Sequence, residues 1–166
     1  MINHRPGRVL ERTAVLSPCG DYRYHLTRRW APGPLEVFCM LNPSTADADL
    51  DDPTIRRCMG FAELRGASGI EIVNLFALRT SSSKELRGAK NPIGPDNNMW
   101  LRKICRSKTV ICAWGLGGAM FNRNFHVMPI FTECNARLTC LRRTTSGHPS
   151  HPLYLPYSTH LEDYAL

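Results

Sequence analysis

The sequence predicts an α/β protein: a three-layer α/β/α domain with a central, mostly parallel four-stranded sheet, preceded by an N-terminal antiparallel hairpin. Short apolar runs of strand length alternate with segments whose apolar residues have helical spacing, which is typical of a parallel sheet covered on both faces. The 166 residues, 43 % hydrophobic and 21 % charged, suit one globular domain of this kind. We therefore expect residues 1–166 to form a single domain, with the hairpin at 10–30 and the core at 35–156.

An alternating pattern predicts the N-terminal hairpin. Tyr22, Tyr24 and Leu26 alternate with polar residues over 22–30, which is the period of a half-buried strand. A turn-forming segment at 18–21 separates this strand from an earlier one at 12–17. The Pro32-Gly33-Pro34 segment then ends the hairpin.

The core elements follow in order along the chain. Buried strands are predicted at 35–41 and 70–75, and further strands at 109–114 and 137–141. The first of them is a nearly continuous apolar run, the pattern of a strand buried on both faces. Asp51 or Asp52 can cap a first helix that has Pro53 at its first position and stops at Gly66. Further helices are predicted to begin near Pro95 and to cover 115–125.

Charge and composition limit the possible function classes. A net charge of +7 favours a polyanionic partner, so we expect DNA or a nucleotide. No apolar run approaches the roughly 20 residues of a membrane helix, and the N-terminus lacks a secretory signal, so we expect a cytoplasmic protein that contacts no membrane. The seven cysteines are odd in number and form no C-x-x-C, which indicates reduced structural thiols. No cofactor is predicted, and the oligomeric state is left open.

Polar or glycine-rich segments follow the four predicted core strands, at the sheet edge where ligands bind in such folds. These segments are Asn42-Pro43-Ser44-Thr45, Asn74-Leu75-Phe76, Trp114-Gly115-Leu116-Gly117-Gly118 and residues 144–153. The glycines of the third segment do not complete a dinucleotide fingerprint, because Met120 stands where the last glycine or alanine would be. Close packing of a helix start on a strand explains them better.

Two groups of residues invite a metal interpretation. His148 and His151 are one pair with Pro149 between them, which does not make a metal site. The acidic segment 47–52 could bind Mg²⁺ through its carboxylates or begin a helix, and we favour the helix start. The carboxylates that remain as a weaker metal alternative are Asp47, Asp49 and Asp52.

In identity, order and placement, the four strand-end segments resemble motifs of the uracil-DNA glycosylase superfamily, and most closely those of a bacterial and phage group, domain-of-unknown-function family 1643. The resemblance covers roughly Leu35 to Leu153. It implies that Asn42 activates a water, that Asn74 reads the edge of a base and that Ala113-Trp114-Gly115 packs beneath the pocket. It also implies that the histidine of His148-Pro149-Ser150 faces the departing base, with Ser150 at a phosphate.

The chemistry of N-glycosidic cleavage suits these residue types. A neutral histidine can donate to the negative charge that develops on the leaving base, and an asparagine can position the attacking water. We therefore predict Asn42 and His148 as catalytic residues. The predicted base- or ligand-binding residues, including Phe61 or Phe76 for stacking, are Pro43, Ser44, Thr45, Phe61, Asn74, Phe76, Ser150 and His151.

We also predict where a polyanion would bind. If 22–30 is a strand, Arg23, His25, Thr27 and Arg29 share one face, and the basic hairpin would contact nucleic acid through Arg23 and Arg29. Leu153 or Tyr154 could wedge into a base stack if a base is flipped.

The expected function is recognition of a nucleobase or nucleotide by a glycosylase-like protein. The first loop lacks the acidic residue and the tyrosine of efficient uracil-excising enzymes, so a modified or damaged base in DNA, or a free nucleotide, is the expected substrate. Two alternatives stay open. The protein could be a non-catalytic binder of nucleic acid or nucleotide, or a metal-assisted enzyme of modified-nucleotide metabolism.

Overall fold

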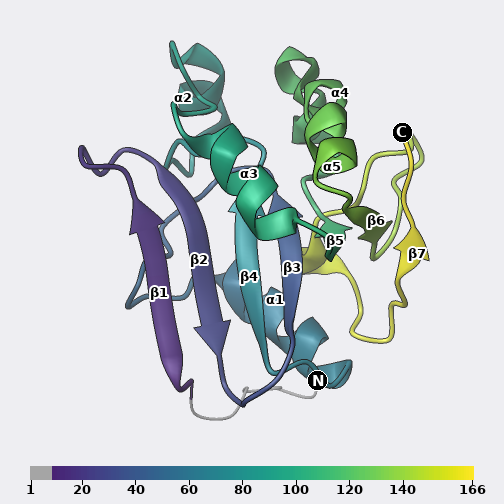
Figure 1. Ribbon diagram of the computed structural model, residues 1–166. Coiled ribbons are helices and arrows are strands. Elements are labelled where there is room, and N and C mark those ends of the chain that lie inside the picture. The colour runs from purple at the N-terminus through teal and green to yellow at the C-terminus, as the bar shows by residue number, and fades with distance from the viewer. Residues whose placement is uncertain (1–8) are drawn as a thin grey trace.

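One mixed sheet organises the computed structural model, which describes residues 9–166 (Figure 1). Its seven strands lie in the order β1-β2-β4-β3-β5-β6-β7. The strands are β1 Glu11–Leu16, β2 Arg23–Arg29, β3 Leu35–Met40, β4 Gly69–Asn74, β5 Thr109–Cys112, β6 Arg137–Cys140 and β7 Glu162–Asp163. The α-helices are α1 Pro53–Leu64, α2 Ser83–Gly88, α3 Asn97–Cys105, α4 Arg123–His126 and α5 Met128–Glu133, and the 3₁₀ helices are η1 Gly115–Asn122 and η2 Pro152–Tyr154.

The prediction of an N-terminal antiparallel hairpin is confirmed by β1 and β2, whereas the prediction of a four-stranded sheet is wrong. The strands β4, β3, β5 and β6 are parallel, but they form the middle of a larger sheet. The hairpin β1–β2 extends it, because β2 pairs antiparallel with β4, with Leu26 opposite Ile72. At the other edge β7 pairs antiparallel with β6. The alternating pattern of 22–30 shows a strand, but it does not show which strand it pairs with.

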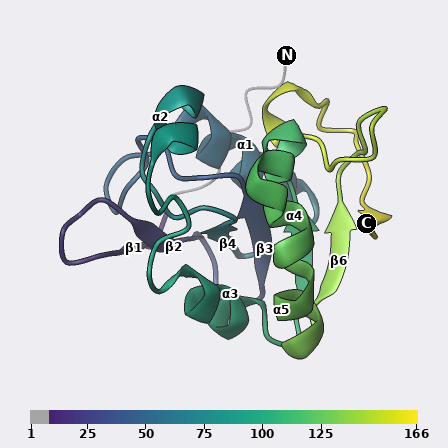
Figure 2. The same ribbon diagram turned by 90° about the horizontal axis from the view of Figure 1, so that it is seen from above.

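Helices cover both faces of the sheet, so the three-layer α/β/α arrangement is confirmed. Figure 2 shows α3 and α5 on one side of the strands and α1 on the other. Val37 and Cys39 of β3 pack in the core with α3 and α5, whereas Phe38 and Met40 pack with α1. Neighbouring residues of a strand point to opposite faces, so a strand buried on both faces reads as one apolar run.

The start of the first helix is confirmed, whereas the helix expected over 115–125 is wrong in detail. Asp52 is the N-cap of α1, and its side chain accepts a hydrogen bond from the Ile55 backbone N–H, with Pro53 in the first turn. The segment 115–125 divides into η1 and α4, because Met120 leaves the helical region and Phe121 has φ +55°. The glycines there do serve packing. A Cβ at Gly118 would overlap the Trp114 indole.

The prediction of free thiols is confirmed. All seven cysteines are unpaired, and six of them are buried. Burial raises the pKa of Cys105 to about 12 and that of Cys140 to about 11, so both stay protonated near neutral pH. None of the helices within residues 9–166 is both long and apolar enough to cross a membrane.

Candidate functional site

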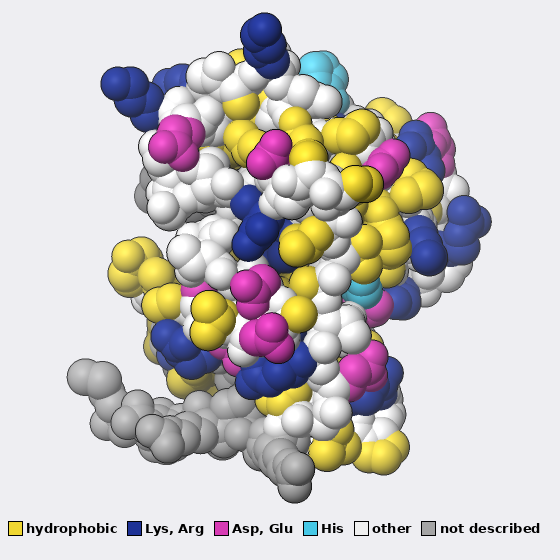
Figure 3. All heavy atoms as spheres, turned by 90° about the vertical axis from the view of Figure 1, so that its left-hand side faces the viewer, with side chains coloured by type: hydrophobic (Ala, Val, Ile, Leu, Met, Phe, Trp, Pro, Cys, Tyr) yellow, Lys and Arg dark blue, Asp and Glu magenta, His cyan; other side chains and the backbone are white. Residues whose placement is uncertain are grey.

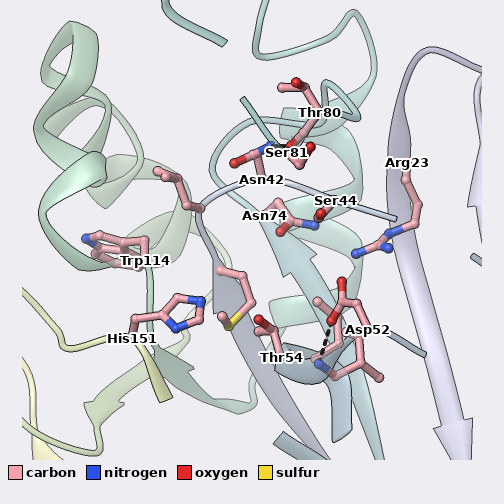
Figure 4. Close-up of a pocket in the computed structure, with 14 residues that line it drawn as sticks. Arg23, Asn42, Ser44, Asp52, Thr54, Asn74, Thr80, Ser81, Trp114 and His151 are labelled. Atoms are coloured by element: carbon pink, nitrogen blue, oxygen red, sulfur yellow. Dashed lines mark hydrogen bonds between the residues drawn. The ribbon is translucent and has the colours of Figure 1, made fainter. Parts of the chain in front are cut away.

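A pocket of about 220 Å³ lies at the carboxyl ends of β3, β4 and β5 (Figure 4). The strand β3 has β4 on one side and β5 on the other, so the chain reverses its direction of travel across the sheet here. Ligands of open α/β sheets bind at such a reversal. The lining residues are Arg23, Met40, Leu41, Asn42, Ser44, Asp52, Thr54, Ile55, Ile72, Asn74, Thr80, Ser81, Trp114 and His151.

Asn74, at the end of β4, contributes an amide without a protein partner. Only 1 % of the residue is exposed, and neither Nδ2 nor Oδ1 makes a hydrogen bond to any residue within 9–166. The backbone at Asn74 is fixed by hydrogen bonds, because Asn97 Nδ2 donates to the carbonyl oxygens of Asn74 (2.9 Å) and Leu75 (3.0 Å). Arg123 Nε also donates to the Leu75 carbonyl, at 2.9 Å. A buried amide that no protein group satisfies is costly, so a donor and an acceptor side by side are kept for a ligand.

Asn42, just after β3, is fixed with its oxygen free. Its Nδ2 donates to the carbonyl oxygens of Thr80 (2.7 Å), Pro43 (3.0 Å) and Leu78 (3.4 Å). Only the amide nitrogen can donate to a carbonyl, so these contacts determine which way the amide group points. Figure 4 shows the Asn42 oxygen directed away from Thr80. Asn42 therefore offers the pocket an oriented acceptor.

His151 is the histidine of the pocket. The Leu153 backbone N–H donates to His151 Nδ1 at 3.2 Å, so the neutral ring carries its proton on Nε2. Burial lowers the pKa of His151, and the negative charge of Asp52 only partly opposes this shift. Near neutral pH the ring is therefore an uncharged donor. Trp114 also lines the pocket, with its ring nitrogen turned away from His151 (Figure 4).

Arg23 and Asp52 form the charged side of the pocket (Figure 4). Arg23 is 2 % exposed, and burial lowers its pKa to about 10 although Asp52 acts in the opposite direction. Its Nη1 donates to the Ala46 carbonyl at 2.5 Å, whereas its Nε has no partner in the described part of the chain. Asp52 Oδ1 accepts from Ile55 N at 2.8 Å.

Buried Arg28 organises the acidic segment beside this pocket. Its Nε donates to Asp51 Oδ1 at 2.7 Å, and its Nη2 donates to the carbonyl oxygens of Asp47 and Leu50. Asp47 Oδ1 accepts from the backbone N–H groups of Asp49 and Leu50, and these hydrogen bonds lower the pKa of Asp47. These contacts give the segment a structural role. Within residues 9–166 no three His, Cys, Asp or Glu side chains are grouped to hold a metal ion.

We expect Arg28→Ala to lower the free energy of unfolding by about 3 kcal/mol, because removing one partner of a buried ion pair leaves the other uncompensated. Urea titration of the purified variant measures this change. Arg12→Ala is the matched control, since Arg12 contacts the same Asp51 at 3.0 Å from an exposed position and should cost about 1 kcal/mol or less. Equal losses in the two variants would contradict the role assigned to Arg28.

The structure brings together part of the predicted site. Asn42, Ser44, Asn74 and His151 line the pocket. Thr45 lines an adjacent hollow that shares Ser44 with it. The other predicted site residues do not line this pocket in the described structure. They are Pro43, Phe61, Phe76, His148, Ser150, Leu153 and Tyr154.

The other predicted positions have different surroundings. Phe61 and Phe76 are buried in the two hydrophobic cores, where Phe61 contacts Tyr157 and Phe76 contacts Phe121 edge-on. His148 is half-buried in the loop before η2, where its backbone N–H donates to the Thr144 hydroxyl. Leu153 and Tyr154 belong to η2, and Tyr154 is 87 % exposed.

The hairpin was expected to present Arg23 on an exposed basic face, and this expectation is wrong for Arg23. Arg23, His25 and Thr27 are buried because β2 lies inside the sheet, and Arg23 belongs to the pocket. Arg29 is near Glu11, with 3.4 Å between Nε and Oε2. Figure 3 shows Lys and Arg side chains interspersed with Asp and Glu on the β1 side of the molecule. The described residues form no continuous basic patch on this face (Figure 3).

Sequence reasoning missed several lining residues. Thr80 and Ser81 lie in the loop after β4, and Thr54 lies in the first turn of α1. Their only signal was a place near the carboxyl ends of β4 and β3, which many surface hydroxyls share. Arg23 gave a misleading signal, because an arginine in an alternating strand usually marks its solvent face.

Comparison with known families supports one assignment. Residues 23–153 match the family described as "Protein of unknown function (DUF1643)", and the chain therefore belongs to this family. The match includes every residue that lines the pocket. No curated protein and no solved structure matches the chain. The relationship to the uracil-DNA glycosylase superfamily stays a prediction from the motifs.

Proposed function

We propose that this member of the DUF1643 family binds a nucleobase in the pocket at the carboxyl ends of β3, β4 and β5 and hydrolyses its N-glycosidic bond. The observation that carries the proposal is the Asn74 amide, buried and without a protein partner. One donor next to one acceptor matches the edge of a base, which presents the same two kinds of group.

Two further side chains suit the cleavage step. A water bonds to the anomeric carbon of the sugar, and the carbon–nitrogen bond breaks with its electron pair moving onto the base. His151 Nε2–H, a neutral donor, stabilises the negative charge that develops there. Asn42 Oδ1 can accept a hydrogen bond from the attacking water and so position it. The proton that the water loses goes to the solvent or to the departing base.

The apolar part of the lining supports a flat, mostly apolar ligand. Met40, Leu41, Ile55 and Ile72 line the pocket together with Trp114. A base has two apolar faces and a polar edge, so apolar walls around a few oriented polar groups suit it. The motif resemblance supports a modified or damaged base as the ligand, carried either by DNA or by a free nucleotide.

Release of free base tests the proposal. We expect the protein to release a base from at least one member of a panel of oligonucleotides and nucleosides carrying uracil, hydroxymethyluracil and deaminated purines, as measured by chromatography. Binding to the same panel is measured in parallel. Tight binding without release from any member would show the non-catalytic binder instead. Neither binding nor release would contradict the assignment of the pocket to a nucleobase.

A further inference from the structure

Arg23 and Asp52 face each other across the pocket, but each makes its direct contacts elsewhere (Figure 4). Asp52 uses Oδ1 to cap α1, and Figure 4 shows its other oxygen directed toward the Arg23 side. Arg23 Nε is buried and unpartnered. The space between them therefore separates a group that can only donate from a group that can only accept.

A hydroxyl is the simple neutral group that satisfies both sides at once. It donates its proton to the Asp52 carboxylate while its oxygen accepts from the Arg23 guanidinium. A phosphate can accept from Arg23 but has no proton to give near neutral pH, and the negative charge of Asp52 repels it. Carboxylates in other nucleotide sites hold ribose hydroxyls for this reason.

We propose that Arg23 and Asp52 bind the 2′- or 3′-hydroxyl of a sugar, so that the ligand is a free nucleoside rather than a base within a DNA strand. This inference rests on the proposed binding of a nucleobase by Asn74. It adds the sugar to the proposed ligand. It also excludes DNA, in which phosphodiester bonds occupy the 3′-hydroxyl and deoxyribose lacks the 2′-hydroxyl.

The hollow next to the pocket supports a ligand without a chain of phosphates. It has a volume of about 480 Å³ and shares Ser44, Thr80 and Ser81 with the pocket. Its charged lining residues are Asp21, Glu85 and Arg79. With two carboxylates for one guanidinium, the hollow repels a polyanion. The hydroxyl groups of Ser44 and Ser81, which also line it, can bind a sugar.

A ligand series tests the inference by isothermal titration calorimetry. The series has one base throughout: the free base, the ribonucleoside, the 2′,3′-dideoxynucleoside and a single-stranded DNA oligonucleotide. We expect the ribonucleoside to bind roughly 10- to 100-fold more tightly than the dideoxynucleoside, the range of a hydrogen bond to a charged group. The oligonucleotide should bind no more tightly than the dideoxynucleoside.

Asp52→Asn separates this role from the structural role of Asp52. Asparagine caps a helix about as well as aspartate, so α1 should keep its N-terminus. In this variant we expect the ribonucleoside to lose its roughly 10- to 100-fold advantage while affinity for the dideoxynucleoside is unchanged. Asp96→Asn is the matched control, because Asp96 is the N-cap of α3 and lies outside the pocket lining.

The outcomes are distinguishable. Equal affinities for the ribonucleoside and the dideoxynucleoside, or tighter binding of the oligonucleotide, would overturn the inference while binding of the free base leaves the proposed function standing. An unchanged preference in Asp52→Asn would also overturn it. If no member of a series built on any of the panel bases binds, the proposed function fails, and this inference fails with it.

Discussion

Replacing His151 by alanine is expected to slow base release about 100- to 1,000-fold, the usual effect of removing one preorganised donor from a developing anion. The reason is local. The Leu153 N–H occupies Nδ1, so Nε2–H is the only donor that the neutral ring can present to the leaving base. His151→Gln keeps an N–H of similar reach and should recover part of the loss. Single-turnover measurements on the best substrate separate this effect from binding.

The pH dependence of the same reaction follows from the direction of the His151 pKa. Burial lowers the pKa of His151, so the ring is neutral at pH 7 and takes up a second proton only in more acidic solution. That proton goes to Nδ1 and breaks the contact with Leu153 N–H. We therefore expect kcat/KM to fall as the pH drops through the pKa of His151, which lies below the ordinary histidine value. His151→Gln should lose this acid limb.

His148→Ala is the matched control for His151. It makes the same change three residues earlier in the same loop, at a side chain that does not line the pocket. We expect its rate to stay within a few-fold of the unmodified protein, because the change removes no group from the pocket. A larger loss in His148→Ala than in His151→Ala would contradict the pocket described above and support the motif assignment of His148 instead.

The sequence predicted the parts of the fold that depend on local patterns. The mostly apolar strands β3 and β4 and the Asp52–Pro53 start of α1 follow from burial and capping, which neighbouring residues determine. The pairing of β2 with β4 could not be predicted in this way. It brings together residues such as Leu26 and Ile72 that are far apart in the chain, and the side-chain pattern of one strand does not name its partner.

The same limit applies to the site. Asn42 and Asn74 were predictable because each is a polar residue directly after or at the end of an apolar strand. The choice between His148 and His151 was not, because it depends on how the loop turns after β6. The Arg143–Pro149 bridge and the Leu153 N–H contact to His151 place the second histidine in the lining. The Arg23–Asp52 pair was hidden for a similar reason, since it depends on the position of β2 in the sheet.

Asn74→Leu is expected to separate stability from function. Leucine has a similar size but no polar atoms, so it removes a buried amide that has no partner in the free protein. We expect the free energy of unfolding to rise by on the order of 1–2 kcal/mol, because leaving a buried polar group unsatisfied costs about that much. Affinity for the base should fall roughly 1,000-fold or more, because the ligand's own polar edge would then be buried unpaired.

Asn97→Leu is the control that gives this result its meaning. Asn97 is buried beside Asn74, but its Nδ2 donates to the Asn74 and Leu75 carbonyl oxygens. The same substitution there removes the side-chain donor to the Asn74 carbonyl and one of the two side-chain donors to the Leu75 carbonyl, and it should lower the free energy of unfolding by about 1–3 kcal/mol. Opposite signs at two neighbouring asparagines, measured by urea titration, would show that the Asn74 amide is maintained at the expense of stability. A loss of stability in both variants would mean that Asn74 has a structural partner and is not reserved for a ligand.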